Sequence, residues 1–142
     1  MDLKLVLQAA EVERLICVGF KSDAPFFHVD ELRPGFARVR MPYRQWMLRP
    51  GGTISGPALF TTADLAMYAL VLSHVGPELM AVTSSLNLNF LSKGVAADVH
   101  AEAHLLKLGR KLAVMEVKLR CGDAQELVAH ATGSYSLPSK RT

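Results

Sequence analysis

The chain has 142 residues, half of them apolar and a fifth charged, with a formal net charge of +3. This length and composition predict one globular domain, residues 1–142, that can bury its own core. A charge of +3 without any basic run gives no argument for a nucleic-acid partner. The start of the chain lacks a signal-peptide pattern, and Cys17 and Cys121 have no metal or redox spacing. We therefore expect free, buried thiols and a cytoplasmic, reducing location.

The first part of the chain predicts a helix followed by a hairpin. Apolar residues recur at helical spacing over about the first twenty residues, which indicates an amphipathic N-terminal helix. Two strands, 26–32 and 36–41, are predicted next. They flank Arg33-Pro34-Gly35, a Pro-Gly turn of the kind that joins antiparallel strands.

A second, much more apolar helix is predicted over residues 57–73. Ser55 or Gly56 is the expected N-cap, and Pro57 falls in the first turn, where its missing N–H costs nothing. Gly76-Pro77 is a common helix terminator. This segment is the expected centre of the fold.

The rest of the chain alternates between apolar and polar residues with period two, which predicts strands with one covered face and one more polar face. The expected covered positions are Leu86, Leu88, Phe90, Val95, Ala97, Val99, Ala101, Ala103, Leu105, Ala113, Met115, Val117, Leu119, Cys121, Leu127, Ala129, Ala131 and Tyr135. We therefore expect an α+β fold, in which an antiparallel sheet curls around the central helix. Its many alanines would let the sheet approach that helix closely.

Asp64 is the only charge between residues 54 and 72. An isolated carboxylate in such surroundings is costly unless it is paired, hydrogen-bonded or protonated. It stands two turns from the free backbone donors at the positive end of the helix, an arrangement that suits acyl chemistry. The alternative is a structural aspartate satisfied by a neighbouring hydroxyl or amide. A membrane span is not expected, since a mid-helix Asp costs about 2.5–3.5 kcal/mol on insertion and strands follow the helix.

Three segments resemble one family in their order and spacing. Residues 52–57, followed by an acid at Asp64, are similar to the pattern Gly-x-(apolar)-His-Gly-Gly with an acid nine residues after the His. Residues 83–91 resemble the strand Thr/Ser-x-Asp-x-Asn-x-x-Phe, and the turn 108–110 and the strand 129–133 are also similar. These features resemble the hotdog fold and, within it, the PaaI-like acyl-CoA thioesterases. The resemblance implies a five- or six-stranded antiparallel sheet wrapped around a long central helix.

The resemblance also implies roles for three residues. The family's catalytic acid falls on Asp64, which would act as general base on water or as nucleophile. The backbone oxyanion donor falls on Gly56, at the start of the helix. A hydroxyl that orients the attacking water falls on Thr83, although a strand threonine without any such role is the alternative.

The chain departs from the family pattern at three positions. Ser55 replaces the His, Pro57 replaces the second Gly, and Arg49 stands where an Asn often assists the thioester carbonyl. Pro57 has no N–H to donate, so an oxyanion hole must rely on Gly56, helped by Arg49 or another main-chain amide. Ser55 is a candidate substrate contact, and its alternative role is that of a helix cap.

The implied substrate is an aryl- or medium-chain acyl-CoA, with coenzyme A as part of the substrate and no separate cofactor. Lys93, Arg110 and Lys111 lie at predicted turns and are candidate contacts for its phosphates, unless they are simply solvated charges. Family members form homodimers, often paired into homotetramers, in which the helix start of one subunit faces the acid of the other. A non-catalytic module that binds acyl-CoA as sensor or carrier is the alternative function, motivated by the departures at Ser55 and Pro57.

Other chemistries have weaker support. His100, Glu102 and His104 share one strand face, but such neighbours are roughly 7 Å apart, too far for one metal ion. The motif Gly-x-Ser-x-Gly is absent, which argues against a serine hydrolase triad. Hotdog dehydratases use a His near the helix, and none lies between Asp30 and Asp64.

Overall fold

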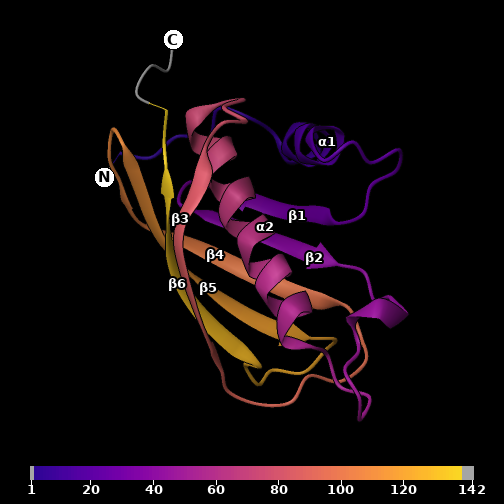
Figure 1. The fold of residues 1–142 in the computed structure, drawn as a ribbon. Helices are drawn as coiled ribbons and strands as arrows, with labels where there is room; N and C mark the ends of the chain where they lie inside the picture. The colour runs from indigo at the N-terminus through magenta and orange to yellow at the C-terminus, as the bar shows by residue number, and fades with distance from the viewer. Residues whose placement is uncertain (1, 139–142) are drawn as a thin grey trace.

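The computed structural model describes residues 2–138 (Figure 1). These described residues form two α-helices and six strands, with a short 3₁₀ turn between β2 and α2. In chain order the elements are α1 (Ala9–Gly19), β1 (His28–Arg33), β2 (Phe36–Met41), the 3₁₀ turn (Gln45–Met47), α2 (Gly56–Val75), β3 (Val82–Phe90), β4 (Val99–Leu108), β5 (Leu112–Cys121) and β6 (Ala129–Ser136).

The six strands form one antiparallel sheet in the order β1-β2-β4-β5-β6-β3. The sheet curls around α2, and α1 lies beside β1 (Figure 1). The predicted arrangement, an antiparallel sheet around a long central helix with a shorter N-terminal helix, is confirmed. Because the sheet is open, β1 and β3 are its edges.

The core lies between α2 and the concave face of the sheet. Ala101, Ala103, Ala129 and Ala131 are fully buried, as the alternation predicted. The helix α2 is long and apolar enough to cross a membrane, but 72% of the relevant window is buried inside the fold. Its apolar character is therefore mostly that of a core helix, although one stripe that includes the exposed Phe60 is not covered.

The largest corrections to the predicted ends concern two elements. The strand expected from Val95 begins at Val99, because the preceding loop is tied elsewhere: the Ile54 N–H donates to the Gly94 carbonyl over 2.9 Å. The N-terminal helix begins only at Ala9, where Gln8 and Glu11 form a capping box. Cys17 and Cys121 are buried and unpaired, as expected.

The turn between β1 and β2 is tied to the end of α2 by His74. Gly35 adopts a φ of 78°, which favours glycine, and its N–H donates to His74 Nε2 over 2.9 Å. His74 Nδ1 lies 2.9 Å from the Leu70 carbonyl oxygen. An acceptor Nε2 requires the neutral ring, with the proton on Nδ1. Burial lowers the pKa of His74, against an opposing effect of the bond to Leu70.

The free energy of unfolding should therefore decrease as the pH falls below about 6.5, the ordinary pKa of histidine. In that range the unfolded chain binds a proton that folded His74 does not, and the loss continues until the pH passes the lowered pKa of the folded state. His74→Gln should depend less on pH, since an amide oxygen can accept from Gly35 without titrating. Urea denaturation between pH 5 and 7.5 measures both. If the unfolding free energy of His74→Gln depended on pH as steeply as that of the wild type, the acid sensitivity would belong to other groups.

Candidate functional site

The Asp64 carboxylate accepts two hydroxyl hydrogen bonds on the same oxygen. Thr83 Oγ1 and Tyr135 OH each donate to Asp64 Oδ1 over 2.7 Å. Tyr135 OH also lies 3.2 Å from the Asp64 carbonyl oxygen. The half-buried Asp64 lines a pocket of about 300 Å³ whose walls include Phe20 and Leu79. The site thus combines one oriented carboxylate with apolar walls.

A β-bulge turns Thr83 toward this carboxylate. Leu86 pairs with Gly133, and Thr83 pairs with Tyr135, with an irregularity between Thr83 and Ser85. Gly133 and Tyr135 share the covered face of β6, so Leu86 and Thr83 lie on one face although strict alternation would separate them. Bulges commonly re-aim side chains in this way.

Tyr135 is the site residue that sequence analysis missed. The alternation placed it only on the covered face of its strand, which the structure confirms, since its side chain is 3% exposed. Its ring stacks on Tyr68 with 5.8 Å between centroids and 20° between planes. Burial raises the pKa of Tyr135, and the nearby Asp64 charge adds to the effect. The available signal was a hydroxyl-bearing aromatic among small residues on a covered face.

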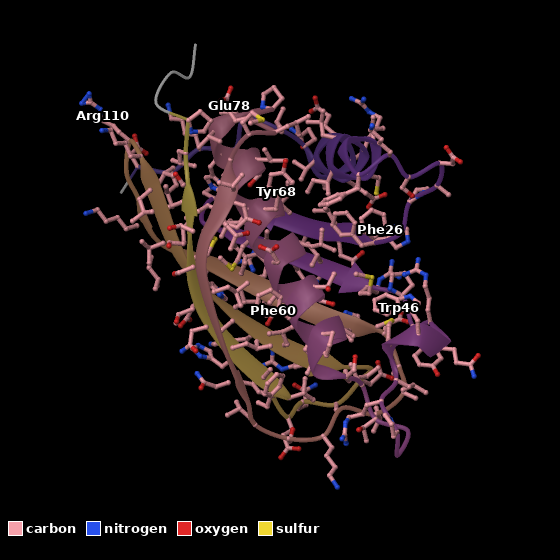
Figure 2. All side chains as sticks on the ribbon, viewed as in Figure 1. Phe26, Trp46, Phe60, Tyr68, Glu78 and Arg110 are labelled. Atoms are coloured by element: carbon pink, nitrogen blue, oxygen red, sulfur yellow. The ribbon has the colours of Figure 1, made fainter. Side chains whose placement is uncertain are left out.

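Four residues of α2 form a stripe along the helix: Gly56, Phe60, Asp64 and Tyr68 recur at i, i+4 spacing. Figure 2 shows Phe60 and Tyr68 at successive levels of α2. At 1.5 Å of rise per residue, Gly56 and Asp64 are about 12 Å apart along the axis. One chain alone therefore does not bring the expected oxyanion donor to the expected acid.

The start of α2 presents the Gly56 N–H beside an apolar groove. As a first-turn residue, Gly56 has an N–H without an intrahelical acceptor. Ser55 is the N-cap, and its Oγ accepts from the Ala58 N–H over 3.2 Å. A Cβ on Gly56 would lie 3.2 Å from the Phe90 ring, so this glycine leaves little room beside it. Phe60 and Phe90 line the adjoining groove of about 540 Å³.

The four cationic candidates fall at two ends of the molecule. Arg49 and Lys93 are exposed and line, together with Gly56, a pocket of about 260 Å³. Arg110 and Lys111 lie between β4 and β5, and Figure 2 shows Arg110 at the upper end of the sheet. The strand register places that turn at the Thr83 end of β3, the end away from Phe90. A single chain does not gather all four cations around one ligand.

Within residues 2–138 no group of three His, Cys, Asp or Glu side chains is arranged to hold a metal ion. Glu102, on the strand face considered above, instead pairs with Arg120 Nη1 over 2.8 Å. The chemistry available at Asp64 is therefore that of a carboxylate with hydroxyl donors, and the chemistry at Gly56 is that of a helix-terminal N–H.

Ser55→Ala should cost about 1 kcal/mol of unfolding free energy, because the cap on the Ala58 N–H is lost. Turnover should stay close to that of the wild type, since the Ser55 hydroxyl is already engaged in capping α2. Thermal unfolding and steady-state kinetics measure the two effects. A large loss of turnover at unchanged stability would give the hydroxyl a part in the reaction.

Comparisons with known proteins identify the family of this chain. The family profile that matches residues 51–128 is that of the thioesterase superfamily. A crystal structure from a Silicibacter species, titled a “putative thioesterase”, is 38% identical, covers 96% of this chain and 95% of its own, and has a TM-score of 0.87. A “putative esterase” of Archaeoglobus fulgidus is 31% identical over 87% of this chain and 80% of its own length.

A variant of the phenylacetic acid degradation protein PaaI from Thermus thermophilus is also similar. It is 28% identical, covers 79% of this chain and 93% of its own, and has a TM-score of 0.67. These likenesses support thioester hydrolysis as the general chemistry. The chain belongs to the thioesterase superfamily, with the hotdog fold of its PaaI-like members.

Proposed function

We propose that this protein hydrolyses an acyl-CoA thioester to the free acid and coenzyme A. The observation that carries the proposal is the Asp64 carboxylate, held by Thr83 and Tyr135 at a pocket with both polar and apolar walls. Asp64 falls where the family pattern has its catalytic acid. The Gly56 N–H, at the positive end of α2, supplies the donor for the developing oxyanion.

Asp64 can serve the reaction in either of two ways. As general base it takes a proton from water, whose oxygen adds to the thioester carbon; the C–S bond then breaks, and the thiolate recovers the proton. As nucleophile it forms a C–O bond while the C–S bond breaks, and water then hydrolyses the resulting anhydride. In both routes negative charge develops on the carbonyl oxygen, where the Gly56 N–H stabilises it.

The exposed edge strand β3 supports this mechanism, because it favours a homodimer that pairs through β3. The strand β3 is a sheet edge and is exposed along most of its length, with Val82 53% and Phe90 62% exposed. A long edge strand with apolar side chains calls for a covering partner. The partner that every copy of this chain can meet is β3 of a second copy, related by a two-fold axis.

Such a dimer brings the two halves of the site together. Antiparallel pairing about Leu86, the middle of β3, puts Val82 of one subunit opposite the partner's Phe90. Asp64 then lies on the side of the interface where α2 of the partner subunit begins, at Gly56 of the partner subunit. Gly56 and Asp64 of one chain, about 12 Å apart along the helix axis, then do not need to meet each other. A homotetramer is the further assembly that the resemblance implies.

The same pairing supports coenzyme A as the thiol half of the substrate. It sets Arg49 and Lys93 of one subunit on the side of the partner's Arg110 and Lys111, where cations suit the phosphates of coenzyme A. A hotdog neighbour from Streptococcus pneumoniae, 22% identical, is titled as a thioesterase with coenzyme A. Phe20, Tyr68 and Leu79 around Asp64 suit an aryl or medium-chain acyl group. A reducing, cytoplasmic location accords with two buried free thiols.

A panel of aryl- and medium-chain acyl-CoA thioesters, followed by thiol release with a colorimetric thiol reagent, tests the proposal. Turnover of at least one panel member is the expected result. Departures at Ser55 and Pro57 favour a second candidate, a sensor or carrier that binds acyl-CoA without turnover. Calorimetric binding of panel members with no thiol release at high protein concentration would establish that candidate instead.

A further inference from the structure

The two hydroxyl groups that donate to Asp64 make its two carboxylate oxygens different. Both bonds end on Oδ1, and within residues 2–138 no hydrogen bond reaches Oδ2. A carboxylate oxygen that already accepts two short bonds is a poorer base than its free neighbour, because its lone pairs are engaged. The proton-accepting or attacking oxygen is then Oδ2.

Two backbone features, a β-bulge in β3 and a glycine in β6, allow these two hydrogen bonds to form. The bulge beside Thr83 puts it on the same face as Tyr135, its register partner. At Gly133, a Cβ would lie 2.6 Å from the Ser85 carbonyl oxygen and 2.5 Å from Met67 Cε. Glycine there lets α2 lie close to β6, so that the Tyr135 hydroxyl, one inward position further, reaches Asp64.

Tyr135 is also held in place from its other side. Its ring stacks on Tyr68, and the Tyr68 hydroxyl donates to the Leu79 carbonyl over 3.0 Å. Burial and the Asp64 charge raise the pKa of Tyr135, which keeps its hydroxyl a donor at neutral and alkaline pH. Tyr68 and Tyr135 are the other titratable groups in this pocket, and no cation within residues 2–138 forms an ion pair with Asp64.

We propose that Tyr135 is a positioning residue that, together with Thr83, fixes Oδ1 of Asp64 so that Oδ2 faces the substrate. The proposal rests on the proposed function and deepens it. It adds a residue to the site that acts on the substrate only through Asp64. It holds whether Asp64 is base or nucleophile, because both routes use one carboxylate oxygen.

Tyr135→Phe keeps the stacked ring and removes only the hydroxyl. We expect kcat to fall about ten- to a hundredfold, the usual effect of a lost bond to a charged group, while KM changes little. The ionised carboxylate also loses a donor and binds a proton more readily. The acid limb of the kcat profile should therefore move to higher pH. An unshifted acid limb would overturn the proposal.

Tyr43→Phe is the matched control, because it removes a hydroxyl from an exposed tyrosine that does not line the Asp64 pocket. Its acid limb should keep the wild-type position. In the double variant with Asp64→Asn, Tyr135→Phe should add no further loss of kcat, since Tyr135 acts through Asp64. Additive losses in that double variant would contradict the proposal.

A titration without substrate separates this proposal from the proposed function. The Asp64 carboxyl carbon, followed by NMR in ¹³C-labelled protein, should show its midpoint at higher pH in Tyr135→Phe than in the wild type, whether or not the protein turns over acyl-CoA. Should that variant fail to fold, 3-fluorotyrosine placed at position 135 keeps the shape and strengthens the donor. It should move the midpoint to lower pH, and an unchanged midpoint would refute the role.

Discussion

Asp64→Asn should reduce kcat by about 10²–10⁴-fold if the carboxylate is a general base, and by more if it is the nucleophile. The amide keeps the shape of the side chain and an oxygen that Thr83 and Tyr135 can still donate to. The fold should therefore survive while turnover is lost. Thiol release from the best acyl-CoA of the panel, with circular dichroism and thermal unfolding on the same samples, measures both effects.

Asp123→Asn is the matched control, since it makes the same chemical change on the exposed turn between β5 and β6 and should leave kcat unaltered. Asp64→Ala is a poorer test. It removes the carboxylate that accepts from the buried Tyr135 hydroxyl, which brings a stability cost into the measurement. A folded Asp64→Asn protein with near-normal turnover would make the carboxylate structural, satisfied by its two hydroxyls.

Most of the fold could be predicted from the sequence because side-chain periodicity is a local property. The strands of the second half alternate cleanly, and α2 is bounded by Ser55 and Gly76, residues whose backbone chemistry starts and stops helices. Alternation alone does not show where a strand stops pairing. Val95 continues the pattern of β4, yet it lies in a loop because the chain there is bonded to the segment before α2.

The site was less predictable because its contacts are not local. Asp64 is visible in sequence as a lone charge in an apolar segment. Counting from Leu86 by twos puts Thr83 on the opposite face, and only the bulge, a property of how β3 pairs with β6, brings it to the carboxylate. Alternation predicts that Tyr135 points inward. Its hydrogen bond to Asp64, however, depends on how close α2 lies to Gly133. Those distances arise from packing across the sheet, which one strand's pattern does not encode.

Two inactive variants should restore activity when combined, if each site takes its acid from one subunit and its oxyanion donor from the other. Gly56→Pro removes the N–H at the first position of α2, where the φ of proline suits a helix and the Phe90 ring must shift slightly to admit the new side chain. Loss of the N–H should lower kcat by about 10²–10³-fold. In a heterodimer with Asp64→Asn, one site receives an intact Asp64 and an intact Gly56, while the other site receives both defects. Random mixing should therefore recover about a quarter of the wild-type activity.

The two variants are mixed after mild denaturation and refolding, and light scattering establishes that the mixture is dimeric or larger. Each variant refolded alone, and wild type refolded alone, are the controls. Recovery in the mixture alone requires that chains exchange and that the site is shared, since no chain in the mixture has both groups. If the mixed dimers formed but stayed as inactive as the separate variants, acid and donor would belong to one chain. The dimer through β3 would then cover an edge strand without completing a site, and the oxyanion donor for Asp64 would have to come from another backbone amide.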